Sequence, residues 1–221
     1  MPAALLALSL WAIPATAQPV AIELVLALDS SASVDIREFR LQLRGLAQAF
    51  GDAEVSKAIA NLAPQGVAVA VMQWGGAGET RLIIPFTVLN SKTDAIIFGL
   101  RIGQSRRRIR ATDTSIATAI RDAQSLLLNN QIDGQRLLID VSGDGPDNSG
   151  LDVEAARQAA YANHIIINGL PIEADESSVT QYYKEHVIIG ADSFIQPARD
   201  FKDYGRAIKA KLLRELVPLA S

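Results

Sequence analysis

Cysteine is absent from the chain, which excludes disulfides, thiolate zinc sites, cysteine nucleophiles and lipoprotein anchors. Histidine is scarce: the two in the sequence, His164 and His186, stand singly beside apolar runs, so we expect packing or surface roles rather than metal ligation. No Gly-x-Ser-x-Gly run is present, so a serine hydrolase is not indicated. Without disulfides, the hydrophobic core must supply the stability of the fold.

An excess of positive charge is also missing. The formal net charge is −3, whereas nonspecific nucleic-acid binding depends on Lys and Arg that neutralise phosphates. We therefore expect no nucleic-acid partner. With 221 residues and 49% hydrophobic content, the chain is long enough for one α/β domain with a substantial core.

Long apolar runs are confined to the N-terminus. The stretch from Ala3 to Ile13 is apolar, and Ala15-Thr16-Ala17 precedes Gln18 in a pattern typical of signal peptidase sites. Pro14 interrupts this run early, and a membrane span needs about 20 apolar residues. We expect residues 1–17 to be a signal peptide, residues 18–221 to be the domain, and the mature protein to be periplasmic or secreted, without a membrane span.

The most informative run is Asp-x-Ser-x-Ser, directly after the apolar residues 22–28. A stretch that is apolar at every position except Glu23 predicts a strand buried on both faces of a parallel sheet, and ligands bind beyond the carboxyl ends of such strands. Asp29, Ser31 and Ser33 offer a carboxylate and two hydroxyls, a set that suits Mg²⁺ or Mn²⁺. The same residue types also form turns and helix caps, so the run alone leaves that reading open.

Apolar spacing and turn residues predict alternating strands and helices. The expected fold is α/β: a doubly wound, mostly parallel central sheet with one antiparallel hairpin strand and helices on both faces. The first helix is expected to have Ser33 as its cap and Asp35 in its first turn. Helices are predicted at 34–50, 52–62, 91–101, 115–129, 151–163 and 201–212, and strands at 22–28, 66–74, 81–86, 136–141, 165–170 and 187–189.

Two further polar segments have two readings each. Asp147 and Asn148 follow Gly-Pro and indicate a turn first, with support of a metal loop as the alternative. The basic run of residues 106–110 is a solvated loop by default, or a rim that steers an acidic partner. Asp140, inside a predicted strand, is expected to be a paired carboxylate at the core or its rim.

These parts together resemble the von Willebrand factor A domain, whose metal-ion-dependent adhesion site (MIDAS) combines Asp-x-Ser-x-Ser with a distant Thr and a distant Asp. The distant Thr opens a helix and has a small and an aliphatic residue five and six positions later, a pattern that Thr114 meets, with Thr112 as the alternative. The distant Asp follows a buried strand and precedes glycine, which selects Asp144. The resemblance implies that the metal ligands are Asp29, Ser31, Ser33, Thr114 and Asp144.

Longer strings resemble a bacterial family of exported von Willebrand A-like domains of unknown function. They are residues 139–145, 167–172, 182–183 and 197–201. This resemblance covers nearly the whole mature chain and implies the fold and the metal site, but it brings no activity.

The expected function is a binding module rather than an enzyme. In the related domains neutral oxygens fill most of the inner shell, which leaves the Mg²⁺ or Mn²⁺ ion electrophilic enough to take an exposed Asp or Glu carboxylate from a protein partner. One alternative is a metal-dependent phosphoester hydrolase with Asp29 as nucleophile, although Ser31 stands where haloacid-dehalogenase-type enzymes have a second Asp. The other alternative is a metal-free structural domain.

Overall fold

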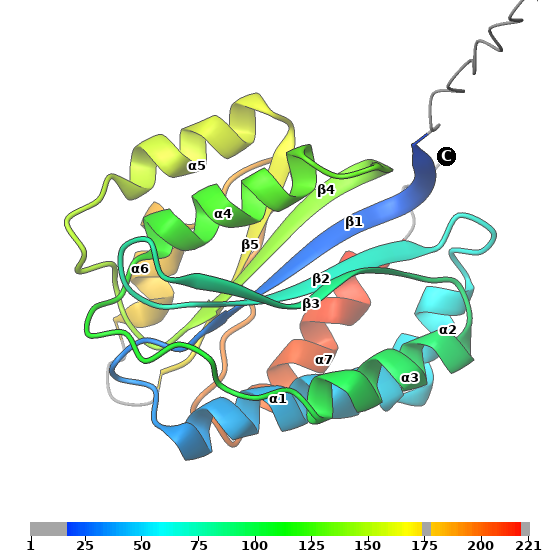
Figure 1. Ribbon diagram of the computed structural model, residues 1–221, viewed down its shortest axis with the longest axis horizontal. Helices are drawn as coiled ribbons and strands as arrows, with labels where there is room; N and C mark the ends of the chain where they lie inside the picture. The colour runs from blue at the N-terminus through cyan, green and yellow to red at the C-terminus, as the bar shows by residue number, and fades with distance from the viewer. Residues whose placement is uncertain (1–16, 174–177, 218–221) are drawn as a thin grey trace, which may run out of the picture.

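A five-stranded sheet in the order β3-β2-β1-β4-β5 forms the centre of the protein (Figure 1). The structure, a computed structural model, describes residues 17–173 and 178–217, so the expected signal peptide lies outside the described residues except for Ala17. β1 is parallel to β2 and β4, β4 is parallel to β5, and β2 and β3 form an antiparallel hairpin. The strands are β1 (Gln18–Asp29), β2 (Val67–Trp74), β3 (Thr80–Leu89), β4 (Ile132–Gly143) and β5 (Ile165–Pro171).

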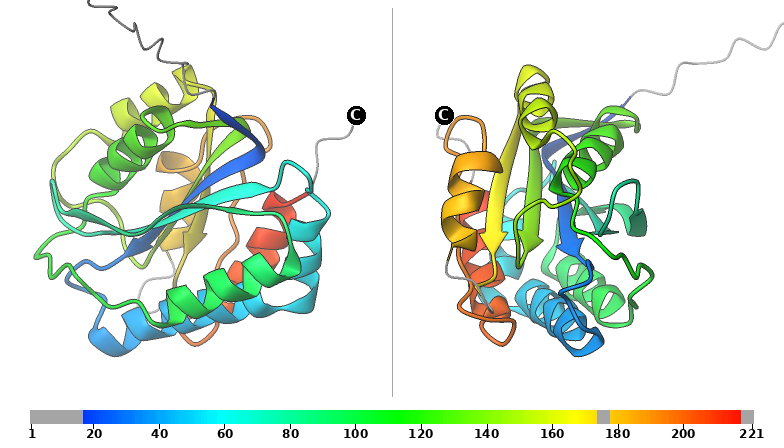
Figure 2. Two further views of the ribbon diagram at one scale, coloured as in Figure 1. Left: turned by 45° about the vertical axis from the view of Figure 1, so that its right-hand side comes forward. Right: turned by 90° about the vertical axis from the view of Figure 1, so that its left-hand side faces the viewer.

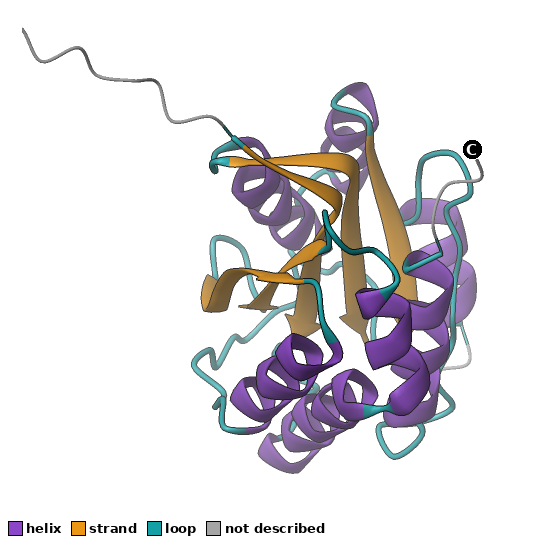
Figure 3. Ribbon diagram, turned by 90° about the vertical axis from the view of Figure 1, so that its right-hand side faces the viewer, coloured by secondary structure: helices purple, strands orange, loops and turns teal. Residues whose placement is uncertain are grey.

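Helices cover both faces of the sheet, so the predicted fold class is confirmed (Figures 1 and 3). One hydrophobic cluster joins the sheet to α1, α2, α3 and α7, and a second joins it to α4, α5 and α6. α6 packs against β5 (Figure 2). The helices are α1 (Ile36–Gly51), α2 (Ala53–Ala60), α3 (Lys92–Gly103), α4 (Ile116–Leu128), α5 (Val153–Ala162), α6 (Val179–His186) and α7 (Tyr204–Glu215).

The central strand shows why the sheet needs both layers. Leu24, Leu26 and Leu28 on β1 belong to the α1 side, whereas Val25 and Ala27 belong to the α4 side. Successive side chains of a strand point to opposite faces, so an uninterrupted apolar run must be covered twice. The apolar run of β1 therefore ends between two layers of helices, and Asp29 is the first polar residue that follows.

Two local predictions were wrong. The first helix begins with a capping box in which Asp35, not Ser33, accepts hydrogen bonds from the backbone N–H groups of Arg37 and Glu38. Residues 187–189 make only a single bridge, Ile189 to Ile167, rather than a strand, and the chain then turns at Gly190 with φ of 104°.

Candidate metal centre

Sheet topology brings two of the predicted loops to one edge. β1 and β4 are neighbours and parallel, with Leu28 in register with Ser142, so their carboxyl ends meet. Asp29 ends β1 and Asp144 directly follows β4. The position is the one at which open α/β sheets bind ligands.

Hydrogen bonds join four of the five predicted ligands. Asp29 Oδ1 accepts from the backbone N–H of Ser31 at 2.7 Å. The hydroxyls of Ser31 and Ser33 are 3.3 Å apart, and Ser33 Oγ donates to Asp144 Oδ1 at 2.7 Å. Asp29 is fully buried, Asp144 is partly buried and Ser33 is exposed, so this set of oxygens leads from the core to solvent.

The second carboxylate oxygen of Asp29, Oδ2, is buried and has no hydrogen-bond partner among the described residues. Burial first, and the nearby Asp144 carboxylate second, raise the pKa of Asp29 above its usual range. Gly143 leaves room at this oxygen, because a Cβ there would lie 2.8 Å from Asp29 Oδ2 and 2.5 Å from the Tyr183 hydroxyl. A divalent cation among these oxygens would offset both the burial and the repulsion.

The loop of Thr114 is tied to the loop that carries Asp144. The backbone N–H of Thr114 donates to Asn148 Oδ1 at 2.8 Å, and the backbone N–H of Asn148 donates to Thr114 O at 3.0 Å. Asp147 Oδ2 accepts from the N–H of Ala117 at 3.1 Å. Thr112 is exposed, and its hydroxyl lies 3.4 Å from Asp113 Oδ1. Asp147 and Asn148 therefore tie the loop after β4 to the segment that carries Thr114.

Nearly the whole chain matches a known protein family. The family model described as "Protein of unknown function (DUF1194)" matches residues 19–220. The chain belongs to this family. No curated protein matches the DUF1194 chain.

Solved structures show that the DUF1194 chain has a von Willebrand A fold. Proximal thread matrix protein 1 from the mussel byssus is 13% identical, with a TM-score of 0.64 over 90% of this chain and 48% of that one. The same mussel protein "with zinc occupied MIDAS motif" is 11% identical, with a TM-score of 0.63 over 90% and 47%. A von Willebrand factor type A protein from Catenulispora acidiphila is 13% identical, with a TM-score of 0.60 over 89% and 43%. This chain therefore spans less than half the length of these proteins.

Sequence reasoning missed the residue that holds the Asp-x-Ser-x-Ser loop in the DUF1194 chain. Arg107 Nη2 donates to Ser30 O at 2.9 Å and to Ser31 O at 3.0 Å, and Nη1 donates to Val34 O. Arg107 is therefore partly buried and bound to this loop rather than fully solvated. It is one arginine in a dense basic run, and nothing in the sequence distinguishes it from its neighbours.

A buried side-chain amide adds to this support. Gln42 on α1 donates from Nε2 to Asp29 O at 3.0 Å, and both residues are buried.

Within residues 17–173 and 178–217, no group of three or more His, Cys, Asp or Glu residues is arranged to hold a metal ion. The cluster of Asp29, Ser31, Ser33 and Asp144 differs because it combines two carboxylates with two hydroxyls. Within the same two ranges, no helix is long and apolar enough to cross a membrane.

Proposed function

We propose that the protein is an exported binding module that uses a divalent cation, Mg²⁺ or Mn²⁺, to bind a carboxylate of a protein partner. Its metal ligands are Asp29, Ser31, Ser33, Thr114 and Asp144, and Thr114 takes the distant position rather than Thr112. The observation that carries the proposal is the buried Oδ2 of Asp29, which has no hydrogen-bond partner among the described residues although the Asp29 carboxylate lies near the Asp144 carboxylate and the Ser31 side chain. An uncompensated buried carboxylate is costly, and a cation removes that cost.

The donor set fits a hard cation. Oxygen atoms alone surround the position, and Mg²⁺ prefers oxygen ligands and retains exchangeable waters. The mussel structure with a zinc-occupied MIDAS belongs to a protein of the same fold, which supports a metal at this edge of the sheet. In the proposed site the three hydroxyls contact the ion directly and the two carboxylates act mainly through water, as in the related domains, so the inner shell is mostly neutral and the ion can take an Asp or Glu carboxylate from outside.

Burial also separates this proposal from the phosphoester hydrolase. A nucleophilic carboxylate must reach phosphorus, whereas the Asp29 side chain is fully buried below the exposed Ser33. Exposure increases from Asp29 to Ser33, which favours an ion that presents one open position at the surface. The proposal places the mature protein in the periplasm or outside the cell, because residues 1–17 have the pattern of a signal peptide.

Calorimetric titration of Mg²⁺ and Mn²⁺ into the chelator-stripped mature protein tests the proposal. We expect saturable binding by the wild type and no detectable binding by Asp29→Ala or Thr114→Ala. Thr112→Ala is the matched control, because it removes the alternative threonine hydroxyl and should bind metal like the wild type. Absence of binding by the folded wild type would favour the metal-free structural domain, and equal loss in Thr112→Ala and Thr114→Ala would overturn the assignment of Thr114.

A further inference from the structure

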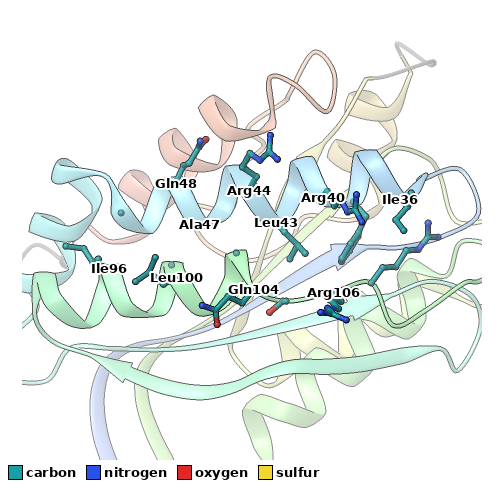
Figure 4. A pocket seen from close by; sticks show the side chains of 16 residues that line it. Ile36, Arg40, Leu43, Arg44, Ala47, Gln48, Ile96, Leu100, Gln104 and Arg106 are labelled. Atoms are coloured by element: carbon teal, nitrogen blue, oxygen red, sulfur yellow. The ribbon is translucent and has the colours of Figure 1, made fainter.

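A long groove runs between α1 and α3 on the face of the sheet opposite α4 (Figure 4). Its volume is about 900 Å³, and its lining extends from Ile36 to Gly51 on α1 and from Ile96 to Gly103 on α3. Gly99 lets the helices approach closely, because a Cβ there would lie 2.7 Å from Ala47 O. The two helices therefore approach closely at Gly99, and Phe39 and Leu43 also line the groove.

Large apolar side chains are exposed along this groove. Ile36 is 51% exposed, Ile96 is 45% exposed and Leu100 is 62% exposed. Ile36 lies at one end of the groove and Ile96 at the other, with Leu100 between them on α3 (Figure 4). Ile96 and Leu100, one helical turn apart on α3, form an exposed apolar patch, and such a patch with a polar rim is typical of interaction sites.

The rim of the groove is positively charged. Arg40, Arg44, Arg106 and Arg107 line it, and no Asp or Glu does. Within the described part of the chain, Arg40, Arg44 and Arg106 make no ion pair with a carboxylate. Arg106 also lines a neighbouring hollow with Arg81 and Arg108, so the positive surface continues toward β3. An occupant of this groove must offer apolar groups flanked by negative charge.

The shape of the groove favours an elongated occupant. It follows the full length of α1, which has 16 residues, and such a helix is about 24 Å long. An amphipathic helix that lays its apolar face into a groove has these dimensions and uses anchors at i, i+3, i+4 and i+7. A compact small molecule would cover only part of this length.

One end of the groove lies at the metal loop. Arg107 lines the groove and also holds Ser30 and Ser31 by hydrogen bonds to their carbonyl oxygens. Ile36, the first residue of α1, follows Ser33 by three positions. A segment lying in the groove can therefore continue directly onto the exposed edge of the metal centre.

We propose that the groove between α1 and α3 binds an acidic, amphipathic helical segment of the partner protein. The inference rests on the proposed function, because the segment belongs to the partner whose carboxylate completes the metal shell. The two surfaces are nevertheless separate: apolar and arginine contacts in the groove need no metal. Groove binding is therefore measured in EDTA, and metal binding is measured without any peptide.

Fluorescence anisotropy with a labelled synthetic peptide tests the groove. The probe has about sixteen residues, with leucine at i, i+3, i+4 and i+7 and glutamate on both flanks. We expect the wild-type protein to bind it in EDTA, and Leu100→Glu or the double variant Arg40→Glu/Arg44→Glu to raise Kd by about tenfold or more. We expect a version of the peptide with lysine in place of glutamate to bind more weakly by a similar factor.

The control variants are chosen on α4, across the sheet. Leu128 is 46% exposed and Arg121 is also exposed, so Leu128→Glu matches Leu100→Glu, and Arg121→Glu introduces one of the two charge reversals of the double variant away from the groove; both should leave the Kd unchanged. Circular dichroism melts check that all variants fold.

Several outcomes would overturn the proposal. The first is no binding of the acidic peptide by the wild type, and the second is equal weakening by Leu100→Glu and Leu128→Glu. In a third outcome, the wild type binds phosphatidylglycerol vesicles but not the peptide, and Leu100→Glu abolishes the vesicle binding. This result would assign the groove to a lipid surface. A fourth is self-association lost in Leu100→Glu, which would assign it to a second copy of this chain. Asp29→Ala separates the two proposals, because it should lose metal binding and retain the peptide.

Discussion

Thr114 and Asn148 form two hydrogen bonds with each other, although 34 positions separate them in the chain. The Asn148 side-chain oxygen accepts from the Thr114 N–H at 2.8 Å, and the Asn148 N–H donates to the Thr114 carbonyl at 3.0 Å. The loop before α4 and the loop after β4 are thereby fixed to each other. In the proposed centre, this pair positions Thr114 relative to Asp144.

Asn148→Ala should therefore weaken Mg²⁺ binding without removing a ligand. The variant loses the side-chain acceptor for the Thr114 N–H, and loss of such outer contacts costs about 10- to 100-fold in metal affinity. Calorimetry measures the change, and Asn129→Ala at the end of α4 is the matched control. Metal affinity equal to that of the wild type in Asn148→Ala would show that this pair does not position the centre.

Arg107→Ala should loosen the Asp-x-Ser-x-Ser loop. The guanidinium donates to the carbonyl oxygens of Ser30, Ser31 and Val34, and lysine lacks the forked donor geometry needed to replace it. Hydrogen exchange should increase across residues 30–35, and Arg107→Lys should behave like Arg107→Ala. Arg108→Ala, outside this network, should leave the exchange unchanged. Unaltered protection of the loop in Arg107→Ala would contradict the role given to Arg107.

Lys211→Met should destabilise the fold severely. Lys211 is fully buried, and its Nζ lies 2.8 Å from Asp140 Oδ2 and 2.5 Å from Glu215 Oε1. Removing the ammonium group leaves two buried carboxylates without a cationic partner, which typically lowers the free energy of unfolding by about 3–5 kcal/mol. Chemical denaturation measures the loss, and Lys209→Met, on the surface, should cost only a small fraction of it. Similar losses in both variants would contradict this account.

Glu23 should make the fold less stable as the pH rises. Its side chain is buried on β1, where burial first and the nearby Asp133 charge raise its pKa from 4.5 to about 7. The folded state therefore binds this proton more tightly than the unfolded state. The contribution of Glu23 to the free energy of unfolding declines between about pH 4.5 and 7 and is constant above. Glu23→Gln should raise Tm relative to the wild type at pH 8, on the order of 5 °C, and much less at pH 4.5. A larger gain at the lower pH would contradict this sign.

The sheet and most of its helices could be predicted because their residues follow regular periods. β1 is apolar at successive positions because both faces are covered, and α1 places Phe39, Leu43 and Leu46 on one face at helical spacing. α6 was missed because only Val179 and Tyr183 among its eight residues are buried hydrophobics, too few to show a helical period. Residues 187–189 have the composition of a strand, but the turn at Gly190 limits their pairing to one bridge.

The ligand residues and their supports differ in how far sequence could identify them. Asp29, Ser31 and Ser33 stand at fixed spacing after a strand, which indicates them as proposed ligands, and the resemblance to the von Willebrand A adhesion site selects Asp144 after a second strand. Arg107 contacts carbonyl oxygens 73 to 77 positions away, and Gln42 contacts the Asp29 carbonyl from within a helix. Contacts to backbone oxygens select no particular residue type in the partner, so no sequence pattern marks them.

The most direct test of the central claim is to locate the metal by paramagnetic broadening of backbone amide signals in an ¹⁵N spectrum titrated with Mn²⁺. A metal at the proposed centre should broaden the amides of residues 29–33, 114–116 and 143–148 first, and Asp29→Ala should abolish the effect. Amides of α2 should remain sharp. Broadening centred on any other surface, or the same broadening in Asp29→Ala, would contradict the assignment of the metal centre.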